Sequence, residues 1–169
     1  MVSRRTEFFR VNKAALRNHI LDQLRNELAV QTRAAQVSHE EAISEESRPE
    51  NKYDMHSQEA AYLAEGQARL AAEIAENILL YESLNVAPVP KDGLTALGSA
   101  VAVEQGTDRT WYFIGPRSGG MELKVEGTTV FVLTPQSPLG RELIGKRVGD
   151  VIGVPSRGAA TPRRIVDLV

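Results

Sequence analysis

The apolar residues in the first half of the chain recur with the spacing of an amphipathic helix. A seven-residue repeat, broken into steps of three and four, connects Leu21, Leu24, Leu28 and Ala35. The same rule holds further on for Ala60, Leu63, Leu70, Ile74, Tyr81 and Leu84. Only Gln67 and Asn77 are polar exceptions in this second series. The pattern predicts two long helices, each with one apolar stripe.

The segment between the two stripes breaks the helical pattern. Residues 44–52 contain no apolar stripe, and Pro49 disfavours a helical conformation at Arg48 and cannot lie inside a helix. We therefore expect an antiparallel coiled-coil hairpin that turns at about residues 46–52. Many small alanines in the second helix would allow close approach of the first.

The second half of the chain changes to the patterns of strands. Four short apolar or alternating runs, separated by Gly, Pro and Asp, are 100–103, 110–114, 121–125 and 129–133. Residues 137–144 then predict a short helix, with Ser137 as its N-cap and Pro138 at its first position. Two further strands are expected at 151–154 and 164–169. Together these elements predict a twisted antiparallel sheet with one short helix, so the class is α+β.

Composition divides the chain at the same place. Residues 1–85 hold one Pro and one Gly, whereas residues 86–169 hold the other 7 Pro and 12 Gly. We therefore expect a hairpin domain over 1–85 and a second domain over 86–169. The first half has 14 acids and 10 Lys or Arg, net −4, and the second has 8 acids and 10 Lys or Arg, net +2. Six of the acids lie within residues 39–54, which favours a basic or metal-bearing target for this end of the hairpin.

Several functions are excluded or disfavoured by what the chain contains. Its 169 residues include no Cys, which excludes disulfides, Cys-bound metal sites and a thiol nucleophile. The three histidines, His19, His39 and His56, are too widely spaced for a dedicated metal site. We find no signal peptide or membrane span, and expect a cytoplasmic protein. A net charge of −2 argues against coating of nucleic acid.

Two glycine-containing segments resemble phosphate-binding loops only superficially. Residues 140–147 have the spacing of a P-loop, but Arg147 stands where Ser or Thr is needed and the interior is helical. Residues 115–120 lie between two expected strands, and we interpret them as a hairpin turn. Nucleotide hydrolysis is therefore rejected.

The segment 133–152 is similar to the C-terminal signature of the bacterial Gre transcript-cleavage factors. It contains a Ser137-Pro138 turn, a short helix with Arg141, and a Gly-Lys-x-x-Gly-Asp turn over 145–150. The aromatic strand that ends in Gly115 also resembles the family. The order of parts, a helical hairpin and then a β domain, agrees with the family along nearly the whole chain. The resemblance implies an FKBP-like fold for the second domain.

The hairpin resembles the family as well, with one departure. Glu50-Asn51 is similar to the Glu-Asn pair of the family's acidic tip, and Glu65-Gly66, fifteen residues on, to a Glu-Gly pair on its second helix. Three residues before Glu50, where Gre factors have an Asp, this chain has Ser47. The nearest preceding acids are Glu45 and Glu46.

The resemblance implies a transcription elongation factor that binds RNA polymerase and inserts its hairpin into the secondary channel. A self-paired hairpin needs no second chain, so we expect a monomer, although the sequence leaves the oligomeric state open. Gln136, Ser137 and Pro138 would contact the channel rim. Glu50, with Glu46 in place of the missing Asp, would help hold a second Mg²⁺ at the polymerase's active site, where backtracked RNA is cut. The chain alone would be no enzyme, would hold no cofactor stably and would not read a nucleic-acid sequence.

Other interpretations stay open. Ser47 is neutral and a poor Mg²⁺ ligand, so the chain could be a secondary-channel regulator without cleavage stimulation. The acids of residues 40–54 could be merely solvated. A coiled-coil adaptor without a polymerase role and an independent prolyl isomerase are rivals from other classes. The isomerase is disfavoured because 5% aromatic residues make an aromatic-lined pocket poor.

Overall fold

The computed structural model describes residues 11–44, 55–89, 93–153 and 162–169. These residues form two compact units: one spans 20–82, and the other combines the residues up to 19 with those from 83 onward. The domain boundary between residues 85 and 86 stays a prediction.

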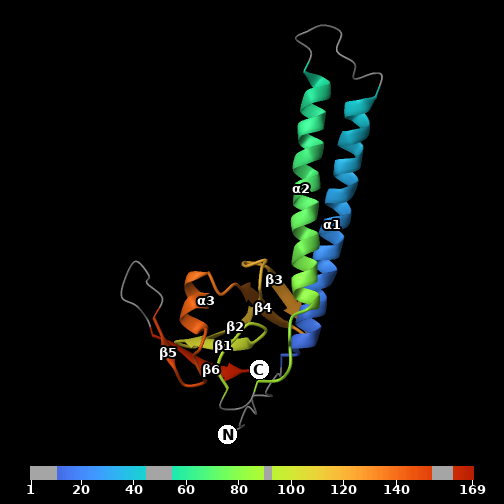
Figure 1. Ribbon diagram of the computed structural model, residues 1–169. Helices are drawn as coiled ribbons and strands as arrows, with labels where there is room; N and C mark the ends of the chain where they lie inside the picture. Colours follow the sequence, from blue (N-terminus) through green and yellow to red (C-terminus); the bar gives the residue numbers. More distant parts are fainter. Residues whose placement is uncertain (1–10, 45–54, 90–92, 154–161) are drawn as a thin grey trace. The chain divides into compact units, whose positions relative to one another are not determined.

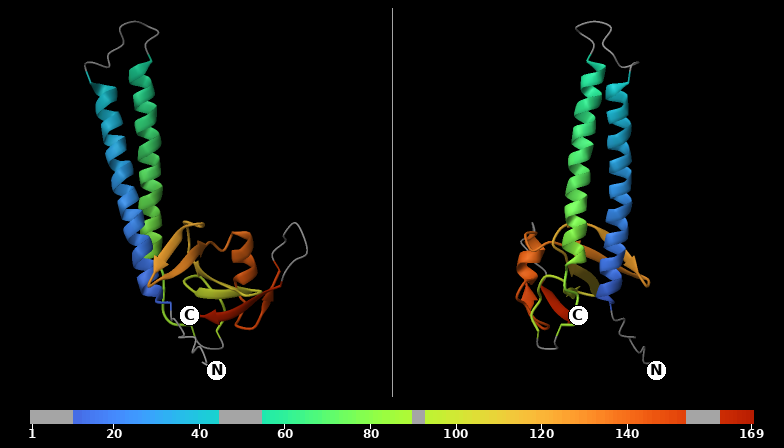
Figure 2. Two further views of the ribbon diagram at one scale, coloured as in Figure 1. Left: turned by 180° about the vertical axis from the view of Figure 1, so that it is seen from behind. Right: turned by 45° about the vertical axis from the view of Figure 1, so that its right-hand side comes forward.

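Two long helices, α1 (Lys13–Ile43) and α2 (His56–Glu82), confirm the predicted helix pair. They lie side by side and run in opposite directions (Figures 1 and 2). The side chain of Asn12 accepts a hydrogen bond from the Ala15 amide, 3.1 Å away, and so caps the start of α1. Within the described ranges no helix is both long and apolar enough to span a bilayer.

The buried seam of α2 differs from the predicted stripe. Its buried members are Ala60, Ala64, Ile74, Ile78 and Tyr81. Between them, Gln67 and Ala71 are half-buried. Leu63 and Leu70, which we expected in the stripe, are 55% and 49% exposed. The expectation was wrong at these two positions because the helix turns its small residues inward, and small residues permit close helix packing.

The second unit contains a six-stranded sheet and confirms the α+β class. Its strands are β1 (Ala100–Gln105), β2 (Asp108–Ile114), β3 (Glu122–Val125), β4 (Thr128–Leu133), β5 (Val151–Ile152) and β6 (Arg163–Leu168). Their order across the sheet is β3-β4-β2-β1-β6-β5. One pair, β2 with β4, is parallel, so the sheet is mixed and not wholly antiparallel as expected.

The parallel pair also corrects the interpretation of residues 115–120. Because β4 lies between β2 and β3, the segment joins two strands that are not neighbours. It is therefore a crossing connection and not a hairpin turn. Gly115 donates a backbone hydrogen bond to the Leu133 carbonyl at the end of β4, 2.8 Å away.

The short helix α3 (Pro138–Leu143) packs on one face of the sheet. Its Leu143 belongs to the buried cluster, and its Leu139 packs against that cluster. The remaining buried members of the cluster are Val101, Val103, Ile114, Ile152 and Ile165. Trp111 and Phe113 alternate onto the opposite face and are buried there.

Candidate functional site

The predicted tip residues Glu45, Glu46, Ser47, Glu50 and Asn51 lie outside the described residues. Their predicted roles are therefore neither confirmed nor corrected. The structure does describe the two helix ends that this segment connects.

These helix ends lie next to each other. The hydroxyl of Ser57, in the first turn of α2, donates a hydrogen bond to the carbonyl of Ala42, near the end of α1, at 2.9 Å. Ser44 caps the end of α1 by donating from its hydroxyl to the Glu41 carbonyl, 3.1 Å away. The acid-bearing segment thus begins and ends at one end of the hairpin.

The other predicted hairpin pair, Glu65-Gly66, lies in the middle of α2. Glu65 forms an exposed ion pair with Arg69 one turn later, 3.6 Å apart. Such exposed pairs contribute little to stability. Glu65-Gly66 therefore lies within a continuous helix, and its functional role stays a prediction.

The loop before α3 has a well-defined shape that depends on Ser137. The Ser137 hydroxyl accepts a hydrogen bond from the Gly140 amide at 3.0 Å and donates one to the Thr134 carbonyl at 2.8 Å. The backbone amide of Ser137 donates to the same carbonyl at 3.0 Å. The predicted N-cap is confirmed, and Pro138 occupies the start of the helix.

Gly140 is required by this loop for a steric reason. An added Cβ would lie 1.9 Å from the Thr134 carbonyl oxygen and 2.8 Å from the Ser137 hydroxyl. The missing side chain lets the loop fold back tightly on the helix. As a result Gln136 and Pro138, on either side of Ser137, are both exposed. The three residues expected to bind the polymerase thus form one turn, in which Gln136 and Pro138 are exposed and Ser137 is half-buried.

Hydrogen bonds to the backbone hold the segment that follows α3, residues 145–150. Gly145 takes a φ of +76°, and its amide donates to the Thr95 carbonyl at 2.8 Å. The Asp150 carboxylate accepts a hydrogen bond from the Arg147 amide at 3.0 Å, closing the following turn. The Gly149 amide donates to the Ile165 carbonyl on β6 at 2.8 Å. Gly145 thus joins the end of α3 to Thr95, and Gly149 joins the following turn to β6.

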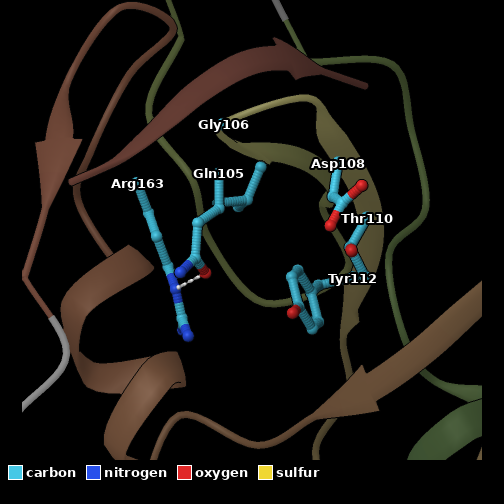
Figure 3. A pocket seen from close by; sticks show the side chains of 7 residues that line it. Gln105, Gly106, Asp108, Thr110, Tyr112 and Arg163 are labelled. Atoms are coloured by element: carbon cyan, nitrogen blue, oxygen red, sulfur yellow. Dashed lines mark hydrogen bonds between the residues drawn. The ribbon is translucent and has the colours of Figure 1, made fainter. Parts of the chain in front are cut away.

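A polar pocket lies on the face of the sheet that carries α3 (Figure 3). Its volume is about 380 Å³. The pairing of Gln105 with Asp108, and of Val103 with Thr110, places alternate residues of β1 and β2 on this face. The lining residues are Val103, Gln105, Gly106, Asp108, Thr110, Tyr112 and Arg163.

Most side chains that line the pocket can donate or accept hydrogen bonds. The Arg163 Nε donates to the Gln105 side-chain oxygen at 2.7 Å, which holds the guanidinium at the pocket wall. Tyr112 is the single aromatic residue among the described lining residues. We did not predict this pocket from the sequence. The available signal was the alternation of Gln105, Asp108 and Thr110 around the Gly106 turn.

The described residues offer no arrangement for a resident metal. Over 11–44, 55–89, 93–153 and 162–169, no group of three or more His, Asp or Glu side chains is placed to hold an ion. His19 instead lies within 2.9 Å of the Ala15 carbonyl on its own helix.

Comparison with known proteins gives similar solved structures but no related sequence family. No family model matches the chain, and no curated protein sequence matches it significantly. It is similar to Gfh1 of Thermus aquaticus, with 23% identity over 89% of this chain and 92% of that one, and a TM-score of 0.37. For GreA factor homolog 1 of Thermus thermophilus the identity is 22%, over 90% and 94%, with a TM-score of 0.36.

A third similar structure is a prokaryotic transcription elongation factor GreA/GreB from Nitrosomonas europaea. The identity is 22%, over 61% of this chain and 78% of that one, with a TM-score of 0.37. Likeness at these identities and TM-scores does not by itself assign the chain to a family.

Proposed function

We propose that the chain is a Gre-type transcription factor that binds bacterial RNA polymerase. The turn formed by Gln136, Ser137 and Pro138 contacts the rim of the secondary channel, and the hairpin enters the channel. The observation that carries the proposal is the shape of this turn. The residues that resemble the family's docking loop are held in one turn by the Ser137 hydrogen bonds, with Gln136 and Pro138 exposed.

The dimensions of the hairpin support the second part of the proposal. The 31 residues of α1 extend about 46 Å at 1.5 Å per residue. The acid-bearing segment begins and ends at one end of this pair of helices. A rod of this length can carry carboxylates from a protein surface to an enclosed active site.

Titration of purified core RNA polymerase with the labelled chain tests this function. We expect saturable binding, weakened at least tenfold by Gln136→Ala combined with Pro138→Ala, which leaves the Ser137 cap intact. A matched control is Glu126→Ala, because Glu126 is exposed in the turn at the other end of β4. Failure of the wild-type chain to bind would contradict the proposal.

Two versions of the proposed function differ in the chemistry of the tip. In the first, Glu50 with Glu46 brings carboxylates to Mg²⁺ held by the polymerase, and the polymerase then cleaves backtracked RNA. In the second, the chain occupies the channel without stimulating cleavage. The second version is favoured by one observation, the neutral Ser47 at the position of the family's Asp.

A cleavage assay on a backtracked elongation complex distinguishes the versions. The first predicts Mg²⁺-dependent shortening of the RNA that Glu50→Ala abolishes. The second predicts no shortening by the wild-type chain. If the tip lacks only a carboxylate ligand for Mg²⁺ at position 47, Ser47→Asp should gain cleavage. Since the reaction belongs to the polymerase in both versions, the chain alone should leave free RNA intact.

A further inference from the structure

The polar pocket on the sheet holds two opposite charges that do not pair with each other. Arg163, at the start of β6, and Asp108, at the start of β2, both line it. Neither forms an ion pair with any residue that the structure describes. By contrast, the guanidinium of Arg109 on the same sheet lies 2.9 Å from the Asp167 carboxylate. The pocket therefore separates two charges that the described chain does not neutralise.

The guanidinium of Arg163 is held in place with its two terminal nitrogens available. Its Nε donates to the Gln105 side-chain oxygen at 2.7 Å, and the two residues come from neighbouring strands. The terminal nitrogens donate no hydrogen bond to a described residue. Arg163 is also half-buried, which strengthens its electrostatic interactions relative to those of a fully solvated side chain. A guanidinium fixed in this way can bind a carboxylate through two parallel hydrogen bonds.

Two hydroxyl groups complete the opposite ends of the pocket. In Figure 3 the Tyr112 hydroxyl points toward the side on which Arg163 lies, whereas Asp108 and Thr110 lie together on the other side. Neither hydroxyl forms a hydrogen bond with a described residue. One end of the pocket thus offers donors beside a positive charge, and the other offers acceptors beside a negative charge.

The size and the charges of the pocket limit the ligand that it can take. A volume of about 380 Å³ is near the lower end of the range of ligand pockets, so the ligand is small. A phosphate or a dicarboxylate would bring excess negative charge toward Asp108, and a simple amine would meet Arg163. Like charges close together weaken binding. A ligand with one carboxylate and one ammonium group avoids both penalties.

We infer that this pocket binds a small zwitterion of the amino-acid class. The terminal nitrogens of Arg163 and the Tyr112 hydroxyl bind its carboxylate, and Asp108 and Thr110 bind its ammonium group. The site uses no residue of the turn at 136–138 and none of the hairpin. The inference is therefore independent of the proposed function, and it can be tested without polymerase.

Titration of the isotope-labelled full chain with each common amino acid, followed by backbone amide chemical shifts, tests this inference. At least one amino acid should bind saturably with a Kd of about 1 mM or tighter. The shifts should centre on Gly106, Tyr112 and Arg163. Acetate and methylammonium each carry only one of the two charges, and both should bind about tenfold more weakly or less.

Substitutions of the two charged residues identify the site. Arg163→Gln and Asp108→Asn should each weaken binding of that amino acid about tenfold or more. Asp108→Asn should also abolish the preference for the amino acid over acetate, which a merely structural change would not do. The matched controls are Arg164→Gln and Glu104→Gln, whose exposed side chains alternate onto the opposite face of the sheet. Both controls should bind like the wild type.

Three results would overturn the inference. The first is the absence of any saturable shift of the pocket residues with the amino acids. The second is binding of acetate or inorganic phosphate as tight as that of the best amino acid, because the pocket would then bind anions alone. The third is an equal loss of binding in the controls and in the pocket variants, because the effect would then not belong to this face of the sheet.

Discussion

The hydroxyl of Ser38 on α1 donates a hydrogen bond to the side-chain oxygen of Gln67 on α2, 3.0 Å away. Ser38 is 6% exposed, so this polar pair lies within an otherwise apolar seam. Buried polar groups are costly when unpaired, and the two side chains satisfy each other only when the helices are in the correct register. The pair therefore explains why a glutamine occupies the seam of the hairpin.

A double-mutant cycle on this pair should reveal a favourable coupling. Ser38→Ala leaves the Gln67 oxygen without its partner and should cost about 1 kcal/mol. Gln67→Leu leaves the Ser38 hydroxyl unpaired, whereas the double variant removes both polar groups and should recover part of the loss. Urea unfolding followed by helical circular dichroism measures the four stabilities. Strictly additive effects would show that the hydrogen bond contributes nothing.

The N-cap of α3 should be measurable in both stability and binding. Ser137→Ala removes the acceptor for the Gly140 amide and should cost about 1 kcal/mol. Under the proposed function, it should also weaken polymerase binding, because the turn carrying Gln136 and Pro138 loses its shape. Ser137→Thr keeps the hydroxyl and should retain most of both properties. Equal loss in the two variants would argue against the capping role.

The same substitution should have opposite effects at two glycines. Gly140→Ala places a methyl group 1.9 Å from the Thr134 carbonyl oxygen, so the loop or helix must move. Such overpacking should lower stability by about 1–3 kcal/mol. At Gly66 the added methyl group meets no atom, and stability should rise. Thermal unfolding of both variants checks the signs, and a stable Gly140→Ala protein would contradict the loop geometry.

Lys13 should give the stability a measurable pH dependence. Burial lowers its pKa below the ordinary value of 10.5, and its Nζ donates to the carbonyl of Ala87. The unfolded chain then binds more protons than the folded chain in the range below pH 10.5, so stability should rise as the pH rises through that range. In Lys13→Met this contribution should vanish. If the difference in unfolding free energy between wild type and Lys13→Met stays constant with pH, the burial of a charged lysine is contradicted.

Local patterns predicted most elements because they encode short-range physics. The seven-residue repeat and Pro49 gave two helices, and Ser137-Pro138 gave the start of α3, since capping depends on adjacent residues. The alternation of Gly, Pro and Asp with short apolar runs likewise gave the positions of the strands. These features depend on residues within one or two turns or along one strand.

Long-range features could not be obtained in the same way. Two seams one residue apart, one through Leu63 and Leu70 and one through Ala64 and Ala71, both follow a helical repeat. Hydrophobicity favoured the leucines, whereas close packing and the Gln67 hydrogen bond select the alanines. The parallel pairing of β2 with β4 depends on which strands become neighbours, and alternation within a strand carries no such information.

The pocket was missed for a related reason. Arg163 reaches Gln105 only because β6 pairs with β1, 58 residues away in the chain. A register shift between Ala102 and Val103 in that pairing determines which residues stand opposite each other. No local motif marks such a contact.

Site-specific photocrosslinking tests most directly whether the turn before α3 binds RNA polymerase. A photoreactive amino acid at position 136 should crosslink to the polymerase at the rim of the secondary channel. The same amino acid at position 126, in the exposed turn at the opposite end of β4, is the control and should crosslink weakly. A chain that binds polymerase but crosslinks equally from both positions, or from 126 alone, would contradict the account.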